Sequence, residues 1–408
     1  MYHGLIKNPK TQEILDDACY LFFEGPASFT GEDCFEIQGH SSLPVIKNIL
    51  ALCCQLGAVP AKEGEFTKRA FINGKIDLSK AESISDLIHA KSNLSTKVAL
   101  NQLQGSLYKK IQTIRGNCKM ALEQIEASID FPDEVDPPEP EALARQINDT
   151  LQIVTDIITK QDYGKYINSG VRCLIVGYPN VGKSSLLNQL LGEDRAIVSD
   201  IAGTTRDFIE STIEIGGIHF ELIDTAGFRE TDNEIEAQGI KRIEDLLPKA
   251  DLVLWVLDQS RALNDAEKDL ATLITSSGTQ SKIYHLLNKS DQDPGLDEDP
   301  NTPQDARLSL SATTGEGINA LKEQLHQDFA ANANALSDDV ICNIRQLSCL
   351  ETVQTRLSDI QDALLKHTTL DMLVIDLKQA VLACGDITGD NLTEEVLDGV
   401  FSRFCVGK

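Results

Sequence analysis

The chain has 408 residues, enough for two to four domains. Hydrophobic residues make up 41% and charged residues 25% of the sequence, which excludes a wholly disordered chain. Lys and Arg number 37 against 63 Asp and Glu, so the formal charge is −26. Because an acidic surface repels a phosphate backbone, autonomous and non-specific binding of nucleic acid is not expected.

Cysteine use and hydropathy predict a cytoplasmic protein. The ten Cys include one adjacent pair, Cys53 and Cys54, and show no spacing typical of a zinc site. The opening residues lack an apolar core of signal-peptide length, and no apolar run approaches the ~20 residues of a membrane span. We therefore expect reduced thiols and a cytoplasmic location.

The first 72 residues predict a small α+β domain. Apolar runs at 20–23 and 35–37 alternate with turn signals, and 42–56 has a helical pattern. From Asp77 to about Ile129, apolar residues at three- and four-residue spacings predict helices.

An acidic run with two consecutive prolines, at 130–138, ends the helical stretch. A further helical stretch covers roughly 141–166. From Val171, short β-rich runs alternate with helical stretches, which predicts a doubly wound, mostly parallel sheet. After about 333 the helical pattern returns, with an amphipathic helix over 347–364.

The strongest chemical signal is GYPNVGKS at 177–184, which fits the P-loop pattern GxxxxGK[ST] between an apolar strand and a helix. In this pattern glycines let backbone N–H groups surround phosphate oxygens. Lys183 would bind the β- and γ-phosphates, and Ser184 would bind Mg²⁺. The flanking strand argues against the alternative of a chance glycine-rich turn.

Three later strand ends extend this site. DTAG at 224–227 would place a carboxylate near Mg²⁺ and an amide near the γ-phosphate. In NKSD at 288–291, Asp291 can accept two N–H bonds from the guanine edge, where adenine would leave a buried acceptor unpaired. SAT at 311–313 can offer backbone N–H groups to guanine O6, although an ordinary turn stays open for SAT alone.

The motifs GYPNVGKS, IAGTTRD, DTAG, NKSD and SAT, in this order, resemble a translation-factor-type GTPase. Phe228 follows DTAG, where many such enzymes carry a Gln that orients water. Three further segments, at 26–42, 65–88 and 404–408 (FCVGK), resemble the tRNA-modifying GTPases of the MnmE (TrmE) family. The resemblance runs essentially from residue 25 to the end of the chain.

The resemblance implies an α/β plus α architecture, with a P-loop GTPase domain inserted in a helical domain. The implied limits are 1–72 for a folate-binding and dimerisation domain, 73–169 and 333–408 for the two helical parts, and 170–332 for the GTPase domain. The family's opening segment, with a first strand and a basic folate contact, is expected to be missing. The start codon would then be misassigned, or the folate half-site damaged.

The resemblance also implies metal and catalytic roles. Asn180, Ser199, Ile201 (through its carbonyl) and Thr204 would hold K⁺, while Ser184 and Thr205 would hold Mg²⁺. A K⁺ ion beside the β and γ oxygens would supply the charge of an arginine finger. Glu236 would orient the attacking water and act with Lys183, a solvated helix-face carboxylate being the alternative for Glu236.

The residues implied to bind GTP are Asn180, Val181, Gly182, Lys183, Ser184, Ser185, Ser199, Asp200, Ile201, Ala202, Gly203, Thr204, Thr205, Asp224, Thr225, Ala226, Gly227, Asn288, Lys289, Ser290, Asp291, Ser311, Ala312 and Thr313. Glu36, Lys75 and Lys408 would contact 5-formyltetrahydrofolate. Cys405 would lie at that folate site as a candidate catalytic thiol, with a buried, inert thiol as the alternative.

The implied function is a K⁺-dependent GTPase that acts as a homodimer. With an FAD-dependent MnmG (GidA)-type partner, in a heterotetramer, it would form a 5-carboxymethylaminomethyl-type group at wobble uridine 34 of certain tRNAs. The partner would make most tRNA contacts, and no membrane is implied. Two alternatives stay open: a ribosome-assembly GTPase, which would be expected to carry a basic RNA-binding appendage, and a weakly hydrolysing nucleotide-sensing scaffold.

Overall fold

A computed structural model describes residues 1–193, 210–224, 243–276, 281–295, 307–331, 340–366, 368–402 and 404–407. The chain forms two compact units. The first unit comprises Met1–His89, Ala99–Ile158 and Ile344–Lys408, and the second comprises Ala90–Val98 and Thr159–Asn343. The second unit therefore interrupts the sequence of the first, and it also takes in a short segment from within the first.

The N-terminal part of the first unit is an antiparallel sheet with strand order β1-β2-β3, followed by a helix. These elements are β1 (Tyr2–Lys7), β2 (Ile14–Phe23), β3 (Cys34–Gln38) and α1 (Leu43–Gln55). The predicted α+β unit is thus confirmed. Large apolar side chains stay exposed on all four elements, among them Tyr2, Phe22, Phe35 and Leu50. Apolar surface this extensive is typical of a protein interaction site.

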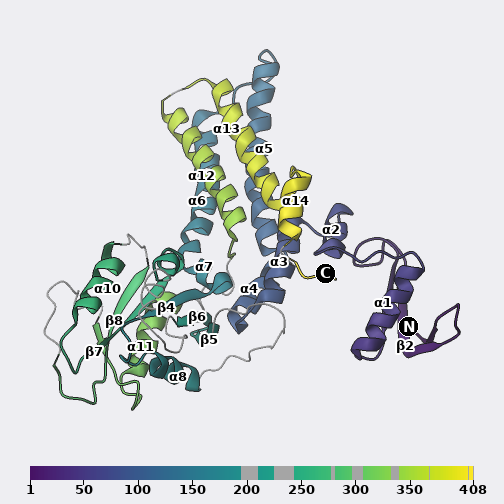
Figure 1. The fold of residues 1–408 in the computed structure, drawn as a ribbon. Coiled ribbons are helices and arrows are strands. Elements are labelled where there is room, and N and C mark those ends of the chain that lie inside the picture. The colour runs from purple at the N-terminus through teal and green to yellow at the C-terminus, as the bar shows by residue number, and fades with distance from the viewer. Residues whose placement is uncertain are drawn as a thin grey trace. The chain divides into compact units, whose positions relative to one another are not determined.

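Helices make up the rest of the first unit, as the spacing predicts. They are α2 (Glu65–Ile72), α3 (Leu78–His89), the second half of α4 (Asn93–Leu103), α5 (Ser106–Asp130), α6 (Pro140–Thr159), α12 (Ile344–Leu365), α13 (Leu370–Thr388) and α14 (Glu394–Phe401). Helices α5, α6, α12 and α13 run side by side as a long bundle (Figure 1). On α5, the buried Ile111, Ile114, Cys118, Ala121 and Ile125 recur at spacings of three and four.

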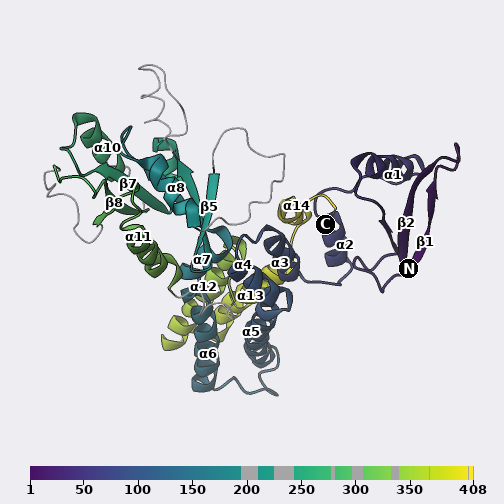
Figure 2. The same cartoon turned by 90° about the horizontal axis from the view of Figure 1, so that it is seen from below.

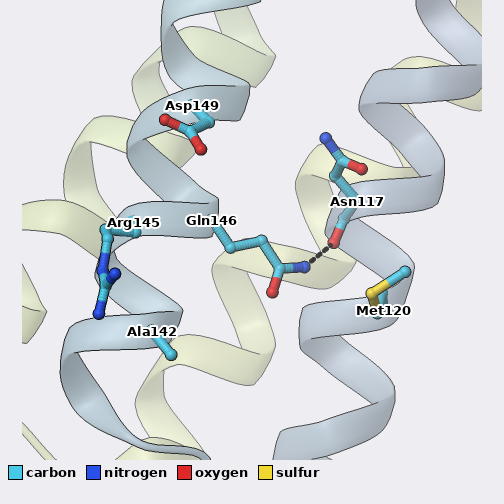
Figure 3. A pocket seen from close by; sticks show the side chains of 6 residues that line it. All are labelled: Asn117, Met120, Ala142, Arg145, Gln146 and Asp149. Carbon is cyan, nitrogen blue, oxygen red and sulfur yellow. Dashed lines mark hydrogen bonds between the residues drawn. The ribbon is translucent and has the colours of Figure 1, made fainter.

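A surface pocket lies between α5 and α6 of this bundle (Figure 3). Beside it, the side-chain amide of Gln146 donates a hydrogen bond of 2.9 Å to the carbonyl of Asn117. The pocket is lined by Asn117, Met120, Ala142, Arg145, Gln146 and Asp149. The lining therefore includes none of the site residues that the sequence predicts.

Within the described ranges, every helix is too short or too polar to cross a bilayer.

A buried ion pair ties α12 to α3. Arg345 donates to both carboxylate oxygens of Glu82 at 2.7 Å, and to the carbonyl of Asp386 at 2.7 Å. The amide of Gln346 donates a further bond of 2.6 Å to Glu82, which is only 7% exposed. Because removal of one partner would strand a buried charge, the pair fixes the point where the chain re-enters the first unit.

The second unit holds a six-stranded sheet with strand order β5-β6-β4-β7-β8-β9. Its strands are β4 (Val171–Val176), β5 (Glu210–Ile215), β6 (Ile218–Asp224), β7 (Leu252–Asp258), β8 (Lys282–Asn288) and β9 (Arg307–Ser309). All neighbours pair in parallel except β5 and β6, which form a hairpin. The predicted, mostly parallel sheet is confirmed, and the antiparallel β5 is an edge strand that the alternating pattern missed.

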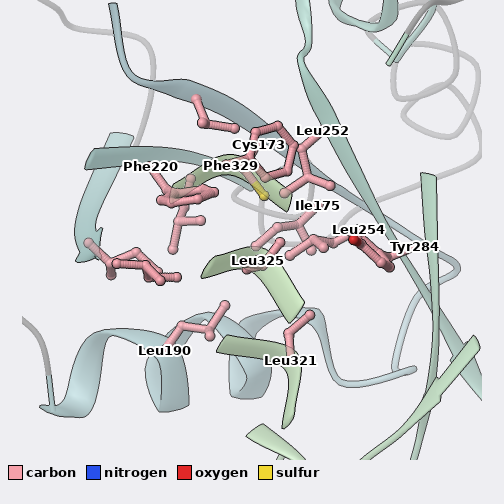
Figure 4. Close-up of a cluster of buried hydrophobic side chains, with 14 of the residues drawn as sticks. Cys173, Ile175, Leu190, Phe220, Leu252, Leu254, Tyr284, Leu321, Leu325 and Phe329 are labelled. Atoms are coloured by element: carbon pink, nitrogen blue, oxygen red, sulfur yellow. The ribbon is translucent and has the colours of Figure 1, made fainter. Parts of the chain in front are cut away.

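Both faces of this sheet are covered by helices, which are α7 (Gln161–Ser169), α8 (Lys183–Glu193), α10 (Asp265–Ser276) and α11 (Ile318–Leu325). Cys173 and Ile175 of β4 face a core that includes side chains of α8 and α11 (Figure 4). Leu174 and Val176 face a second core that includes α10. The layers are visible in Figure 2. Because both faces are buried, the central strand β7 is continuously apolar from Leu252 to Leu257 rather than alternating.

The segment 90–98, which contains the first turns of α4, packs into the second unit. Leu94 and Val98 are buried in the core that α8 and α11 cover. Lys91 forms an ion pair of 2.5 Å with Glu221 on β6. A side chain at Gly217, in the β5–β6 turn with φ +87°, would come within 3.2 Å of Leu94. The glycine thus lets the helix and the hairpin lie in direct contact.

We predict a pH-dependent stabilisation by Asp86→Asn. Burial, and to a smaller degree the negative charge of Glu82, raise the pKa of Asp86, on α3, to about 6. The folded state therefore keeps a proton on Asp86 that the unfolded chain releases above about pH 4. The contribution of this proton to the free energy of unfolding is lost as the pH rises from about 4 to 6. Since Asn is neutral at every pH, it should add about 2 kcal/mol at pH ~8 and little at pH ~4.

Urea unfolding followed by far-UV circular dichroism at the two pH values measures this difference. The exposed Asp133→Asn is the matched control and should change stability equally at both. An Asp86→Asn gain that is the same at both pH values would contradict the prediction.

Candidate nucleotide-binding site

The P-loop connects the end of β4 to the start of α8, as predicted. A Cβ atom at Gly177 would lie 2.4 Å from the carbonyl oxygen of Val256, and one at Gly182 would lie 2.1 Å from Asn288 Nδ2. Gly182 has φ +101° and Asn180 has φ +64°. Both glycines are therefore required for the loop to pass this close to β7 and β8.

Lys183 and two serines begin α8. The ammonium of Lys183, a residue only 7% exposed, donates bonds of 2.8 and 2.9 Å to the carbonyls of Gly177 and Tyr178. Ser184 and Ser185 are exposed in the first turn of the helix. Free backbone N–H groups and the helix dipole make such a turn favourable for a phosphate group.

Asn288 joins the P-loop to the two predicted base-recognition segments. Its amide donates 2.7 Å to the carbonyl of Val181, and its amide oxygen accepts 2.8 Å from the N–H of Ala312. Asn288 is 2% exposed, so both bonds are shielded from water. A third link, from the Ser290 N–H to the Leu310 carbonyl at 3.1 Å, holds the NKSD and SAT segments together.

The carboxylate of Asp291 is oriented by the SAT segment. The hydroxyl of Ser311, a fully buried residue, lies 2.5 Å from Asp291 Oδ1. Asp291 itself is exposed, which leaves its carboxylate accessible to a ligand. Thr313 is also exposed, beside the Ala312 N–H that Asn288 engages. The sequence-predicted NKSD and SAT residues therefore lie together at one edge of the sheet.

Several predicted residues fall outside the described part of the chain. They are Ser199, Asp200, Ile201, Ala202, Gly203, Thr204, Thr205, Thr225, Ala226, Gly227, Glu236 and Lys408. Asp224 is described only as the last residue of β6. Of the predicted metal ligands, the described part contains Asn180 and Ser184 in full. In that same part, no group of three or more His, Cys, Asp or Glu side chains is placed to hold a metal ion.

The carboxyl-terminal tail docks on the start of α2. Val406 forms an antiparallel bridge with Glu63, and the Gly64 N–H donates 3.3 Å to the Cys405 carbonyl. Phe401 and Phe404 pack with Leu78 and Phe71 in one small core. The thiol of Cys405 is exposed, so the alternative of a buried thiol is wrong.

The predicted folate residues lie on separate elements. The ammonium of Lys75 donates 2.7 Å to the carbonyl of Pro26, which holds the 26–31 loop against the start of α3. Glu36 is exposed on β3. Among the described residues, no hydrogen bond or ion pair joins Glu36 to Lys75.

Sequence reasoning missed one buried charge at this edge. Asp258 is the last residue of β7, opposite Asn288 of β8 in the parallel register. A carboxylate closes the apolar run LVLWVLD, but that position lies outside the five motifs GYPNVGKS, IAGTTRD, DTAG, NKSD and SAT.

Gly182→Ala should lower the affinity for GTP and GDP by at least about tenfold, because the new methyl group displaces Asn288 and strains the backbone. Gly192→Ala is the control, since Gly192 is exposed on the same α8 and a Cβ there would meet nothing within 4 Å. Titration with a fluorescent guanine nucleotide measures both. Equal affinities in the two variants would show that the close approach is unimportant.

Two family models match this chain. The model described as MnmE helical domain matches residues 78–405, and the model described as GTP-binding protein TrmE N-terminus matches residues 1–75.

Curated relatives match over the whole chain. The tRNA modification GTPase MnmE of Natranaerobius thermophilus is 40% identical over 414 residues, covering 100% of this chain and 89% of that protein. The same-named proteins of Thermotoga maritima and Geobacter sulfurreducens are 39% and 37% identical over 411 and 410 residues. They cover 100% of this chain, and 90% and 89% of those proteins. Because one family model covers residues 78–405 and these relatives are 37–40% identical over the whole chain, the chain belongs to the MnmE family of tRNA modification GTPases.

Proposed function

We propose that this chain hydrolyses GTP in order to modify the wobble uridine of certain tRNAs. The enzyme class, GTP hydrolase, follows from family membership. The observation that carries the tRNA role is the likeness to tRNA modification GTPases over 100% of the chain. The P-loop and the NKSD and SAT segments support it, because they lie together at the sheet edge where ligands of α/β proteins bind.

The proposed domains are an N-terminal domain over 1–72, helical parts over 73–169 and 333–408, and a GTPase domain over 170–332. The family models, which divide the chain between residues 75 and 78, support the first limit. The unit that interrupts the helical bundle supports an inserted GTPase domain.

For the chemistry, we propose that Ser184 and Thr205 bind Mg²⁺, and that Asn180, Ser199, Ile201 and Thr204 bind K⁺. The described residues fit this assignment, because Ser184 is an exposed hydroxyl at a helix N-terminus and Asn180 offers a neutral amide oxygen in the P-loop. Bound K⁺ would supply positive charge to the transferring phosphate. Lys183 would bind phosphate oxygens, and Glu236 would orient the water.

For partners, we propose a homodimer that assembles with an FAD-dependent MnmG-type protein and binds 5-formyltetrahydrofolate. The exposed apolar surface of the N-terminal sheet supports a dimer. Glu36, Lys75 and Lys408 are the proposed folate contacts, and Cys405 the proposed thiol at that site. The net charge of −26 supports a partner that makes most contacts to tRNA.

A gene deletion tests the tRNA role. Loss of the aminomethyl-type C5 nucleoside is expected in tRNA hydrolysates analysed by mass spectrometry, and the wild-type gene should restore it. Gly64→Ala should not restore it, because the new Cβ would lie 2.8 Å from the Phe401 carbonyl oxygen and undock the tail. Gly74→Ala is the matched control, with a similar φ of +68° and nothing within 4 Å.

Both glycine variants should keep wild-type GTP turnover, which separates the tail from the nucleotide site. An unchanged nucleoside in the deletion strain would refute the tRNA role. Restoration by Gly64→Ala would refute only the need for a docked tail.

GTP turnover in KCl should exceed that in NaCl at equal ionic strength by about tenfold or more, because Na⁺ is too small for a site built for K⁺. Asn180→Ala should abolish this difference. Single-turnover phosphate release at saturating GTP measures both. Equal rates in the two salts for the wild-type protein would remove Asn180 from its proposed role.

A further inference from the structure

The carboxylate of Asp258 is buried beside the NKSD segment but lies outside the five sequence motifs of the nucleotide site. Its side chain is 6% exposed, although a charged group rarely gives up water without a strong partner. In the parallel register Asp258 lies opposite Asn288, the residue that holds the P-loop. A buried charge at this position calls for a specific reason.

Three donor groups from two residues engage this carboxylate. Lys289 Nζ lies 2.5 Å from Oδ2, while the N–H and hydroxyl of Ser260 donate to Oδ1 at 3.0 and 2.6 Å. Burial raises the pKa of Asp258, but the hydrogen bonds from Lys289 and Ser260 outweigh it and hold the pKa below its usual value. The carboxylate is therefore ionised at neutral pH, and Lys289 is its principal charge partner.

Arg261 is a weaker charge partner of Asp258 than Lys289 is. Its guanidinium makes two parallel bonds of 2.8 Å to Glu267, and its Nε forms only a longer ion pair of 3.7 Å with Asp258. Glu267 is 1% exposed and also accepts from the N–H of Asn264 at the start of α10. The two buried carboxylates thus have different roles. Glu267 links Arg261 of the loop after β7 to the start of α10, and Asp258 fixes the position of Lys289.

The Asp258–Lys289 contact fixes the path of a long side chain. Lys289 starts at the carboxyl end of β8, with φ +69°, and its ammonium ends at the carboxyl end of β7. Its four-carbon stem must therefore run along the sheet edge where Asn288 and Asp291 also lie. Such stems readily cover apolar surface. A free Lys would lose rotamer entropy on being held there by a ligand.

We infer that Asp258 is a positioning residue for guanine nucleotides, which holds Lys289 so that its apolar stem forms a preset wall against the purine ring. The inference depends on the guanine assignment of NKSD. Since GTP and GDP share the base, Asp258 should strengthen the binding of both equally. It should not affect the choice of purine, which we assign to Asp291. It should not affect the rate of hydrolysis, which depends on residues around the phosphates.

The test uses the full chain with Asp258→Asn, which retains an acceptor for Ser260 but loses the charge that holds Lys289. The dissociation constants for GTP and GDP should both rise about tenfold. The kcat at saturating GTP should change less than about twofold, and the preference for GTP over xanthosine triphosphate should not change. Asp291→Asn, in contrast, should shift that preference.

Two further variants isolate the Asp258–Lys289 contact. Lys289→Met keeps an apolar stem without the ammonium and should weaken both nucleotides about as much as Asp258→Asn does. The double variant should be no weaker than either single one, because both changes remove the same interaction. Glu267→Gln is the matched control for a buried carboxylate, and it should lower the thermal midpoint while keeping nucleotide affinity.

Wild-type affinity in Asp258→Asn or in Lys289→Met, or additive losses in the double variant, would overturn the inference. If Asp258→Asn does not fold, wild-type affinity in Lys289→Met still overturns the inference, since Lys289 is half-buried and its loss leaves Asp258 its Ser260 bonds. A wild-type chain that binds no guanine nucleotide would refute the guanine assignment instead, so the two failures are distinguishable.

Discussion

Two hydrogen bonds from one buried amide hold the nucleotide edge together. Asn288 bonds to the P-loop through Val181 and to the SAT segment through Ala312. Three chain segments far apart in sequence thereby reach one place. Because Asn288 is shielded from water, loss of either bond would leave a buried polar group unsatisfied. Position 182 requires a glycine because any side chain there would occupy the space of the Asn288 amide.

Much of this could be predicted from sequence, because the signals are local. The P-loop pattern predicted the strand, loop and start of α8, and apolar periodicity predicted the bundle helices. The edge strand β5 was missed because its antiparallel pairing depends on a turn, Gly216–Gly217, rather than on its own pattern. Asp258 was missed because its importance comes from a partner on the neighbouring strand, which no linear pattern displays.

The two ends of the first unit show the same contrast. The FCVGK tail was one of three segments that resembled the family, yet only the structure shows Cys405 bonded to Gly64 with its thiol exposed. The ion pair between Arg345 and Glu82 joins residues from opposite ends of the chain and was invisible in the sequence. The switch-loop threonines and Glu236 lie outside the described residues, and their roles stay predictions.

Helix α4 belongs to both units along one unbroken rod. Its first turns, with Leu94, are wedged against the β5–β6 hairpin, whose strands lead from the IAGTTRD segment and into DTAG. A methyl group added at Gly217 would therefore press on α4 and on the hairpin together. Neither element could make room for it without drawing Leu94 out of the core that both share.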